Sequence, residues 1–256
     1  MNNTPESLNT RTPPARLLQD RVILITGAAG GIGQAIAMDM AAYGATTILL
    51  DRDVSGLEQA YDSIVGAGHP EPALYPMDLQ GAEPDDYTQL AATLADEFGQ
   101  LDGLVHNAAQ LGALVPFANY DNELWFQNLQ ANLNAPYLLT TACLGLLNAS
   151  QDASIVFTSD AAGRKGKAYW GSYGVSKAGM EIFMQTLAEE LESNTSIRVN
   201  SLDPGPVHTA LRRIAYPAED SSQLRSPADV TRAFLYLIGP ESRGITGRQF
   251  TLEDML

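Results

Sequence analysis

The sequence predicts an α/β fold in which helices cover both faces of a doubly wound parallel sheet. Short β-rich runs alternate with amphipathic stretches of helical spacing from Arg21 onward, an order typical of right-handed βαβ units. The 256 residues are 45% hydrophobic, which is enough for one large core. We therefore expect a single domain over residues 20–256, preceded over residues 1–19 by a flexible, polar, proline-containing arm.

Hydrophobic spacing divides the domain into strands and helices. The expected strands are residues 22–25, 46–50, 73–77, 104–106, 154–158, 197–202 and 249–252. The expected helices are residues 32–43, 57–65, 87–98, 173–191 and 230–238, with 123–147 forming either two consecutive helices or one bent near Pro136. Residues 204–228 carry four prolines and no regular spacing. Because ligands bind beyond the carboxyl ends of parallel strands, this segment is a candidate substrate lid.

Composition argues against several classes of function. The formal net charge of −15 repels phosphate backbones and anionic lipid, so we expect no nucleic-acid or membrane partner. The acidic surface is either ordinary or adapted to salt. The sequence contains neither an apolar run of membrane-spanning length nor a secretory signal, which predicts a cytoplasmic protein. A single cysteine, Cys143, and three histidines without ligand spacing predict no disulfide framework and no metal.

A glycine-rich turn joins the first expected strand to the first expected helix. It reads Thr26-Gly27-Ala28-Ala29-Gly30-Gly31-Ile32-Gly33. Glycines permit the tight turn and let backbone N–H groups approach a pyrophosphate at the helix N-terminus. This context, a β-run before the turn and a helix after it, predicts a Rossmann-type dinucleotide site.

The end of the second strand carries the residues that choose between cofactors. Asp51 lies about twenty residues after the glycines, where a carboxylate accepts hydrogen bonds from ribose hydroxyls and repels a 2′-phosphate. Arg52 follows it and offers that phosphate a cation. We weight Asp51 more heavily, because an anion facing a phosphate without a partner is costly. The expected cofactor is NAD, with NADP possible.

Beyond the glycine turn, a series of short motifs follows along the chain. With the turn included, they are Thr26-Gly27-x-x-x-Gly31-x-Gly33, Asp78, Asn107-Ala108-Ala109, Asn132, Tyr173-x-x-x-Lys177 and Pro204-Gly205 with Thr209. On these motifs the chain resembles the short-chain dehydrogenase/reductase family over nearly its whole length from Arg21. They occur in the order and approximate spacing of the family, although Ala109 replaces a glycine. Residues 163–177 and 239–242 are similar to a bacterial subgroup, the YciK-type oxidoreductases.

The resemblance implies an oxidoreductase that moves a hydride between a nicotinamide cofactor and an alcohol or carbonyl group of a small molecule. It also implies about seven strands and a homodimer or homotetramer that pairs through residues 123–147 and 173–191. The catalytic group is then Tyr173 with Lys177 and Asn132. The cofactor contacts, with the two strand-end residues included, are Gly27, Gly31, Ile32, Gly33, Asp51, Arg52, Asp78, Leu79, Asn107, Tyr173, Lys177, Pro204, Gly205, Val207 and Thr209.

The chemistry of Tyr173 and Lys177 agrees with this role. Tyrosine with a pKa of about 10 is a poor base at neutral pH. Lys177 lies one helical turn after Tyr173 and therefore on the same face. Its ammonium favours the tyrosinate. The resemblance adds that Lys177 holds the nicotinamide ribose and that Asn132 positions a water linking Lys177 to solvent.

One position departs from the family pattern. The family normally has a serine thirteen residues before the tyrosine, where it donates a hydrogen bond to the substrate oxygen; here the residue is Asp160. An ionised aspartate cannot donate and opposes tyrosinate formation. Three interpretations stay open: a protonated Asp160, a substitution by Ser159 despite strand alternation, or a nucleotide-binding protein with weak or no turnover. We place an active enzyme first and the binding protein second.

The lysines are few and unevenly distributed. The chain contains only Lys165, Lys167 and Lys177. The first two lie with Arg164 shortly before Tyr173. We favour the interpretation of a solvated loop, with a positive mouth that attracts anionic substrates as the functional alternative.

Overall fold

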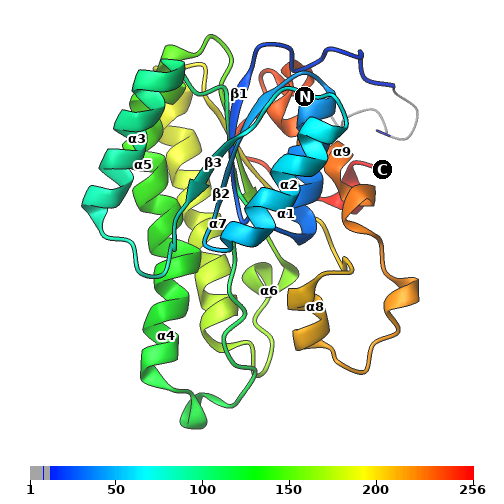
Figure 1. Ribbon diagram of the computed structural model, residues 1–256. Coiled ribbons are helices and arrows are strands. Elements are labelled where there is room, and N and C mark those ends of the chain that lie inside the picture. The colour runs from blue at the N-terminus through cyan, green and yellow to red at the C-terminus, as the bar shows by residue number, and fades with distance from the viewer. Residues whose placement is uncertain (1–7, 9–11) are drawn as a thin grey trace.

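The computed structural model describes Leu8 and residues 12–256. In this part of the chain, seven strands form one parallel sheet in the order β3-β2-β1-β4-β5-β6-β7 (Figure 1). The strands are β1 (Val22–Thr26), β2 (Thr46–Asp51), β3 (Ala73–Pro76), β4 (Gly103–His106), β5 (Ser154–Thr158), β6 (Arg198–Asp203) and β7 (Gln249–Thr251). The doubly wound α/β fold is confirmed, and each strand end lies within one residue of its predicted position.

Helices form a layer on each face of the sheet (Figure 1). One face packs against α1 (Gly31–Ala42), α2 (Val54–Gly66) and α9 (Thr231–Ile238). The other packs against α3 (Pro84–Phe98), α5 (Ala135–Ala149) and α7 (Gly171–Glu192). Alternate side chains of β1 enter the two cores: Ile23 and Ile25 enter the first, and Leu24 enters the second. Central strands buried on both faces explain the continuous apolar runs of the sequence.

The long helical stretch before β5 resolves into two helices. α4 (Asn122–Leu129) passes through one π-helical stretch, Gln130–Asn134, into α5. Pro136 lies in the first turn of α5, where its missing N–H costs little. The two-helix alternative is therefore the observed one, and the irregular turn falls just before Pro136.

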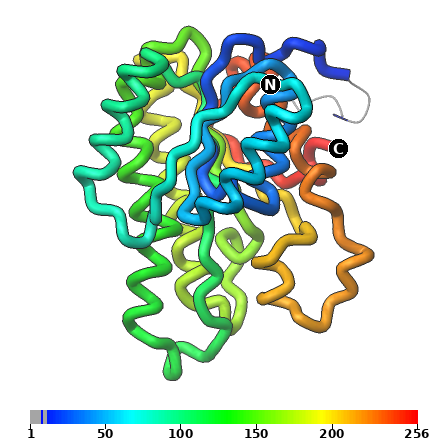
Figure 2. The backbone as a smooth tube through the Cα atoms, in the orientation of Figure 1, coloured from blue at the N-terminus to red at the C-terminus, as the bar shows by residue number. Residues whose placement is uncertain are grey.

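Two short helices lie near the carboxyl end of the sheet. α6 (Ala161–Arg164) follows β5, and α8 (Ala210–Ala215) follows β6. From α8 to α9 the backbone runs out from the sheet and back as a long loop (Figure 2) that includes the 3-10 turns Ser221–Gln223 and Pro227–Val230. The segment predicted as irregular is thus mostly loop.

The arm predicted over residues 1–19 lies largely outside the described residues. Leu8 is buried and its N–H donates to the carbonyl of Met255 at 2.9 Å. Leu18 is fully buried and its N–H donates to the carbonyl of Tyr43 at 3.0 Å. These parts of the segment pack on the domain, and the flexibility of the arm as a whole stays a prediction.

An ionic cluster ties the amino ends of the strands together. Asp152, just before β5, accepts hydrogen bonds from Arg21 before β1 and from Arg198 at the start of β6. Arg243 adds a third ion pair at 3.0 Å. Although burial opposes the charge, the hydrogen bonds from Arg243, Arg198 and Arg21 lower the pKa of Asp152. The cluster, defined by these four residues, joins four chain segments near the amino ends of the strands.

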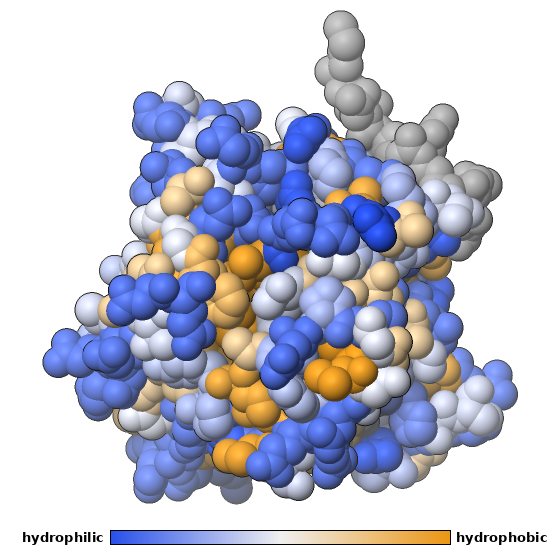
Figure 3. Space-filling model, turned by 45° about the horizontal axis from the view of Figure 1, so that its top comes forward, coloured by the Kyte–Doolittle hydropathy of each residue, from blue (hydrophilic) through white to orange (hydrophobic). Residues whose placement is uncertain are grey.

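Polar residues dominate the face of the molecule that Figure 3 shows. Figure 3 shows a mostly hydrophilic face on which apolar surface is limited to small patches. None of the described helices is long and apolar enough to cross a membrane. In the described residues, no group of three or more His, Cys, Asp or Glu side chains is arranged to hold a metal ion.

Candidate active site

The glycine turn brings three chain segments into close contact. Gly27 and Gly31 adopt φ values of 69° and 55°, a region that side chains with a Cβ rarely occupy. A Cβ on Gly33 would lie 2.1 Å from the carbonyl oxygen of Gly27, and one on Gly27 would lie 2.8 Å from the Cα of Ala108. The turn between β1 and α1 therefore needs glycine at both close approaches.

Thr26 fastens this turn to the end of β4. Its Oγ1 accepts hydrogen bonds from the N–H groups of Asn107 at 3.0 Å and Ala108 at 3.1 Å. The Asn107 side chain returns a bond from Nδ2 to the carbonyl of Thr26 at 3.2 Å. β1 and β4 are the neighbours between which the chain order reverses, and ligands bind at such a switch point.

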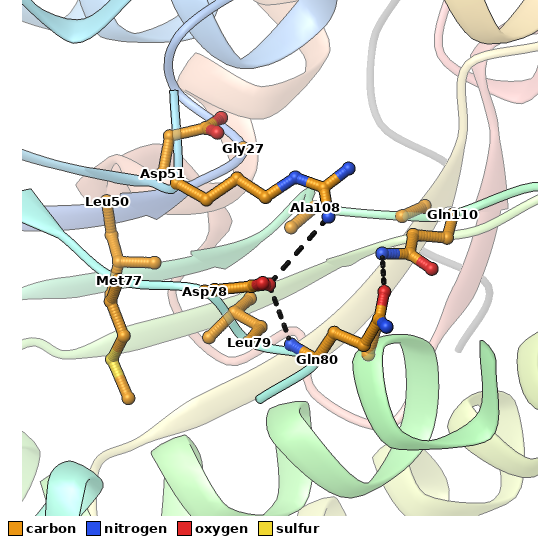
Figure 4. A pocket seen from close by; sticks show the side chains of 12 residues that line it. Gly27, Leu50, Asp51, Met77, Asp78, Leu79, Gln80, Ala108 and Gln110 are labelled. Carbon is orange, nitrogen blue, oxygen red and sulfur yellow. Dashed lines mark hydrogen bonds and ion pairs between the residues drawn. The ribbon is translucent and has the colours of Figure 1, made fainter. Parts of the chain in front are cut away.

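A cavity of about 220 Å³ lies beside the ends of β2 and β3 (Figure 4). Both oxygens of Asp51 accept backbone N–H groups, from Ala29 at 3.2 Å and Asp53 at 3.1 Å. Arg52 is more than half exposed and lies 3.9 Å from Asp78, itself bound by the N–H of Gln80. Both oxygens of the Asp51 carboxylate are thus hydrogen-bonded to backbone N–H groups, whereas the Arg52 guanidinium is accessible to a ligand.

A second cavity, of about 410 Å³, continues from the first across the carboxyl edge of the sheet. Four residues line both: Gly27, Asp51, Ala108 and Ala109. Of the predicted site residues, the second cavity is lined by Gly27, Gly31, Ile32, Asp51, Asn107, Asp160, Tyr173, Lys177, Pro204, Gly205, Val207 and Thr209. The first adds Arg52, Asp78 and Leu79. The fold therefore gathers the predicted residues along one cleft, except Gly33 and Asn132, which line neither cavity.

Tyr173, Lys177 and Asp160 meet at the inner end of this cleft. The Tyr173 hydroxyl donates to Oδ2 of Asp160 at 3.3 Å, while Oδ1 of Asp160 accepts the N–H of Ala162 at 2.7 Å. Asp160 is thereby the N-cap of α6, a role that suits aspartate and serine equally. Lys177 Nζ donates to the carbonyl of Thr158 at 2.6 Å and lies 5.8 Å from the Tyr173 ring centre.

The electrostatics of this group disfavour the tyrosinate. Burial, the negative charge of Asp160 and its hydrogen bond raise the pKa of Tyr173 well above its usual range. Burial also lowers the pKa of Lys177 to about 8, an effect that the charges of Asp160, Glu181 and Asp203 partly offset. Lys177 therefore loses its proton more easily than a lysine in water, which weakens its support for a tyrosinate. The negative charge of Asp160 disfavours the tyrosinate as well.

Asn132 lies in the π-helical stretch and is buried. Its Oδ1 accepts the N–H of Gln110 at 2.7 Å, and its Nδ2 faces the Gln110 carbonyl at 2.8 Å, Asn128 Oδ1 at 2.7 Å and Ser176 Oγ at 3.2 Å. Ser176 belongs to α7, one turn after Tyr173. Asn132 therefore joins α7 to the segment after β4. Its role with a water near Lys177 stays a prediction.

Ser159 is hydrogen-bonded to Glu181 on α7. Its hydroxyl donates to the buried carboxylate of Glu181 on α7, which also accepts from Ser201 at 2.7 Å and Gln249 at 2.9 Å. Arg164 completes the group at 3.2 Å from Glu181. Ser159 lies after the end of β5 at Thr158. Its hydroxyl already has a partner in Glu181, which argues against its taking the place of Asp160.

A cluster of aromatic and cationic side chains lies at the outer end of the cleft. Of its members, Lys167 had been placed from the sequence, in a solvated loop or a positive mouth. Trp170 stacks obliquely on both Tyr173 and Tyr216, with ring centres 5.5 and 5.9 Å apart. Lys167 Nζ lies 4.9 Å from the Trp170 ring and 5.0 Å from the Tyr216 ring, and bonds the Tyr216 hydroxyl at 2.5 Å. Arg212 stacks on Tyr216 at 3.8 Å. For Trp170, the only indication in the sequence was its proximity to Tyr173.

Comparison with known proteins settles the family. A family model described as short chain dehydrogenase matches residues 21–220. The chain belongs to the short-chain dehydrogenase family. This family member is 42% identical over 238 residues to the uncharacterized oxidoreductase YciK of Escherichia coli strain K12, covering 93% of this chain and 94% of that protein.

Two solved structures extend the comparison. A putative short chain dehydrogenase from Pseudomonas syringae has a TM-score of 0.92 and 46% identity, with 94% of this chain and 98% of that chain covered. One from Escherichia coli CFT073, described as complexed with NADPH, has a TM-score of 0.91 and 42% identity, with 94% of this chain and 100% of that chain covered. The predicted similarity to YciK-type oxidoreductases is confirmed.

Proposed function

We propose that this family member is an NADP(H)-dependent oxidoreductase that moves a hydride between the nicotinamide and a small molecule, in the first instance an alcohol or carbonyl compound. One observation carries the proposal: Tyr173 and Lys177 lie at the inner end of a cleft that begins at the glycine turn. A titratable pair beside a nucleotide cradle is the arrangement that hydride transfer with proton relay requires.

The cleft fits a dinucleotide. The close approaches at Gly27 and Gly33 hold the turn tightly against Ala108 and the first turn of α1. Gly30, Gly31 and Ile32 line the cleft at the N-terminus of α1, where backbone N–H groups would meet a pyrophosphate. Ile32 and Thr209 would flank that region, and Asn107, Pro204, Gly205 and Val207 would border the nicotinamide end. Leu79 and Asp78 would border the adenine end.

The choice of NADP(H) over NAD(H) revises the weight that the sequence gave to Asp51. Both oxygens of Asp51 already accept backbone N–H groups, which spreads its charge over the turn. Arg52 is exposed enough to pair with a 2′-phosphate, an interaction that arginine makes well. A relative at 42% identity described as complexed with NADPH supports the same choice.

The chain's own groups would handle the proton. When bound, the nicotinamide accepts or supplies the hydride. The Tyr173 hydroxyl would give a proton to the substrate oxygen in reduction and take it back in oxidation. Lys177, buried and bonded to Thr158, would supply positive charge next to the hydroxyl and hold the ribose. Trp170 and Tyr216 would exclude water from the outer end.

Titration with NADPH and NADH tests the cofactor assignment. We expect NADPH to bind the protein more tightly than NADH, and Arg52→Ala to weaken NADPH at least about tenfold while leaving NADH unchanged. Arg16→Ala, an exposed arginine that lines neither cavity, is the matched control. Tighter binding of NADH, or equal loss of both cofactors in Arg52→Ala, would refute the assignment.

A second candidate function is nucleotide binding with little or no turnover. Asp160 favours it, because its charge raises the pKa of the only tyrosine at the inner end of the described cleft. This candidate predicts NADPH binding without cofactor turnover on a panel of ketones, aldehydes, alcohols and imines. Substrate-dependent oxidation of NADPH that Tyr173→Phe abolishes would exclude it.

A further inference from the structure

The Asp160 carboxylate is fixed beside the place where a substrate must react. One oxygen accepts the N–H of Ala162 at 2.7 Å, and the other faces the Tyr173 hydroxyl at 3.3 Å. A substrate heteroatom that exchanges a proton with Tyr173 must come within hydrogen-bond distance of that hydroxyl. The same atom can then approach Oδ2 of Asp160, the oxygen that faces this hydroxyl.

The hydrogen-bonding capacity of this oxygen discriminates between substrates. An ionised carboxylate only accepts hydrogen bonds, and so does a carbonyl oxygen. Two acceptors brought together repel each other. The nitrogen of a protonated imine carries an N–H and a positive charge, so that it donates to the carboxylate in a charge-assisted bond. Asp160 therefore opposes a carbonyl group and attracts a protonated carbon–nitrogen double bond of the same shape.

Two carboxylates and the ammonium of Lys177 stand around the reacting position. Asp203, on β6, is mostly buried, and its carboxylate accepts the N–H of Gly205 at 2.8 Å. The charges of Asp160 and Asp203 both raise the pKa of Tyr173, so negative potential reaches the hydroxyl. Lys177 is the buried cation, and its Nζ is bonded to the Thr158 carbonyl. A cationic substrate relieves the repulsion between the two carboxylates.

The walls of the cleft suit an apolar ring. Trp170 and Tyr173 form a small hydrophobic cluster with Leu111 and Ala162, joined by the partly buried Leu211 and Tyr216. The nearby cation Lys167 is engaged by the faces of Trp170 and Tyr216. An aromatic or aliphatic ring fits against such a wall, with its polar end at Asp160.

We propose that this site reduces protonated cyclic imines with an apolar body in preference to ketones of the same shape. The proposal rests on the proposed function, from which it takes the reduced nicotinamide. The imine carbon gains the hydride and the new C–H bond. The π pair of the C=N bond becomes the nitrogen lone pair, which yields a neutral amine and the oxidised cofactor. No further oxidant or reductant enters the step.

A pair of two-ring compounds tests this preference. Dihydroisoquinoline and tetralone share two fused six-membered rings of similar size. The reacting C=N bond lies within a ring of the first compound, and the reacting C=O bond projects from a ring of the second. With NADPH, we expect kcat/KM for the imine to exceed that for the ketone at least about tenfold, which is one factor of ten in transition-state binding. Asp160→Ser and Asp160→Asn keep a side-chain acceptor for Ala162 and remove the carboxylate. Both should lower this ratio at least about tenfold.

Binding gives a readout that does not depend on turnover. Calorimetry of the protein with NADP⁺ should show tetrahydroisoquinoline, a cation at neutral pH, binding more tightly than tetralol, and Asp160→Ser should remove the difference. Asp203→Asn, which removes a carboxylate from the same region without touching Tyr173, should lower the ratio less than Asp160→Ser does.

Failure of this proposal is distinguishable from failure of the proposed function. Absence of NADPH binding would refute both, because the reduction needs the cofactor. NADPH binding with a preference for the ketone, with equal use of both compounds, or with neither compound bound or reduced would overturn the imine proposal alone. An equal fall of the ratio in Asp203→Asn and Asp160→Ser would overturn the assignment to Asp160.

Discussion

Asp160 makes two contacts that matter for the candidate site. It caps α6 through Ala162 and stands against the Tyr173 hydroxyl. Serine could perform the first function equally well. What the carboxylate adds is charge at the proton-transfer position, and its consequences appear in the titration of Tyr173.

Replacing Asp160 should change the pH dependence of alcohol oxidation. Oxidation needs a deprotonated Tyr173, whose pKa is raised by burial and then by the charge and hydrogen bond of Asp160. Asp160→Ser removes the charge and the hydrogen bond of the carboxylate but leaves the burial. The pKa of Tyr173 therefore falls, and the acid limb of kcat/KM moves to lower pH. Asp160→Ala should shift the limb likewise but give lower rates, because alanine supplies no donor.

The measurement is the pH–rate profile of the three proteins with the best alcohol found. An acid limb that stays in place, or moves to higher pH in Asp160→Ser, would show that the carboxylate does not govern Tyr173.

Some features of the candidate site could be predicted from the sequence, and others could not. Tyr173 and Lys177 share a helical face, and Asp160 stands thirteen residues before Tyr173. The proximity of the three side chains could therefore be predicted. The bond from Lys177 to the Thr158 carbonyl could not, because a backbone acceptor leaves no mark in residue type. Arg52 was visible, yet the binding of Asp51 by two N–H groups depends on the conformation of the turn.

At the scale of elements, α7 connects the reacting groups to three strands. Tyr173 and Lys177 lie toward its N-terminal end, and Glu181 follows one turn after Lys177. Glu181 reaches Ser159 after β5, Ser201 on β6 and Gln249 on β7. Burial opposes its charge, but these three hydrogen bonds and the charge of Arg164 lower the pKa of Glu181.

Glu181→Ala should lower the free energy of unfolding by about 3 kcal/mol, because it leaves Arg164 and several buried donors without their acceptor. Glu181→Gln keeps the shape and should cost less. Glu189→Ala, exposed on the same helix, should change stability by no more than about 0.5 kcal/mol. Urea unfolding measures all three, and a Glu181→Ala protein as stable as Glu189→Ala would contradict the importance of this network.

Element boundaries were predictable where hydrophobic period and length agreed. The π-helical stretch Gln130–Asn134 was not, because its extra backbone spacing has no composition of its own. α6 is only four residues long, too short for an apolar period. An aspartate N-cap just before Ala161 was the only sign of it in the sequence.

At the scale of the whole molecule, the two ends of the parallel strands have different roles. The cleft lies at the carboxyl ends, and the cluster of Asp152 with Arg21, Arg198 and Arg243 connects chain segments at the amino ends. The carboxylate attracts the three guanidinium groups, and this attraction joins four chain segments and holds the amino ends of the strands together.

Stability should depend on pH through Asp152. Its pKa is lowered from the ordinary 3.8 in the folded state, so its contribution is fully present above 3.8 and is lost as pH falls through the lower folded value. Asp152→Asn should cost about 3 kcal/mol at neutral pH. The gap in Tm between the two proteins should narrow as pH falls below about 4, and a gap independent of pH would refute this account.

Assembly is the second prediction at this scale. The helices expected to pair carry exposed apolar residues: Phe126 on α4, Tyr137 on α5 and Ile182 on α7, each more than half exposed. We predict a homodimer or homotetramer closed by two-fold symmetry. Light scattering at micromolar concentration should show it, and Ile182→Asp should weaken it. Ile214→Asp, equally apolar and exposed on α8, should leave the mass unchanged. A monomeric wild-type protein would refute the prediction.

The distribution of the lysines has a practical consequence for handling the protein. Lys177 is buried, so Lys165 and Lys167 are the exposed lysine amines, and both line the hollow beside Asp160 and Tyr216. Reagents that acylate amines will therefore modify the mouth of the cleft. Coupling through lysine to a sensor chip or resin would anchor the molecule by its own entrance, whereas attachment through Cys143 is prevented by burial. Immobilisation should use a terminal tag.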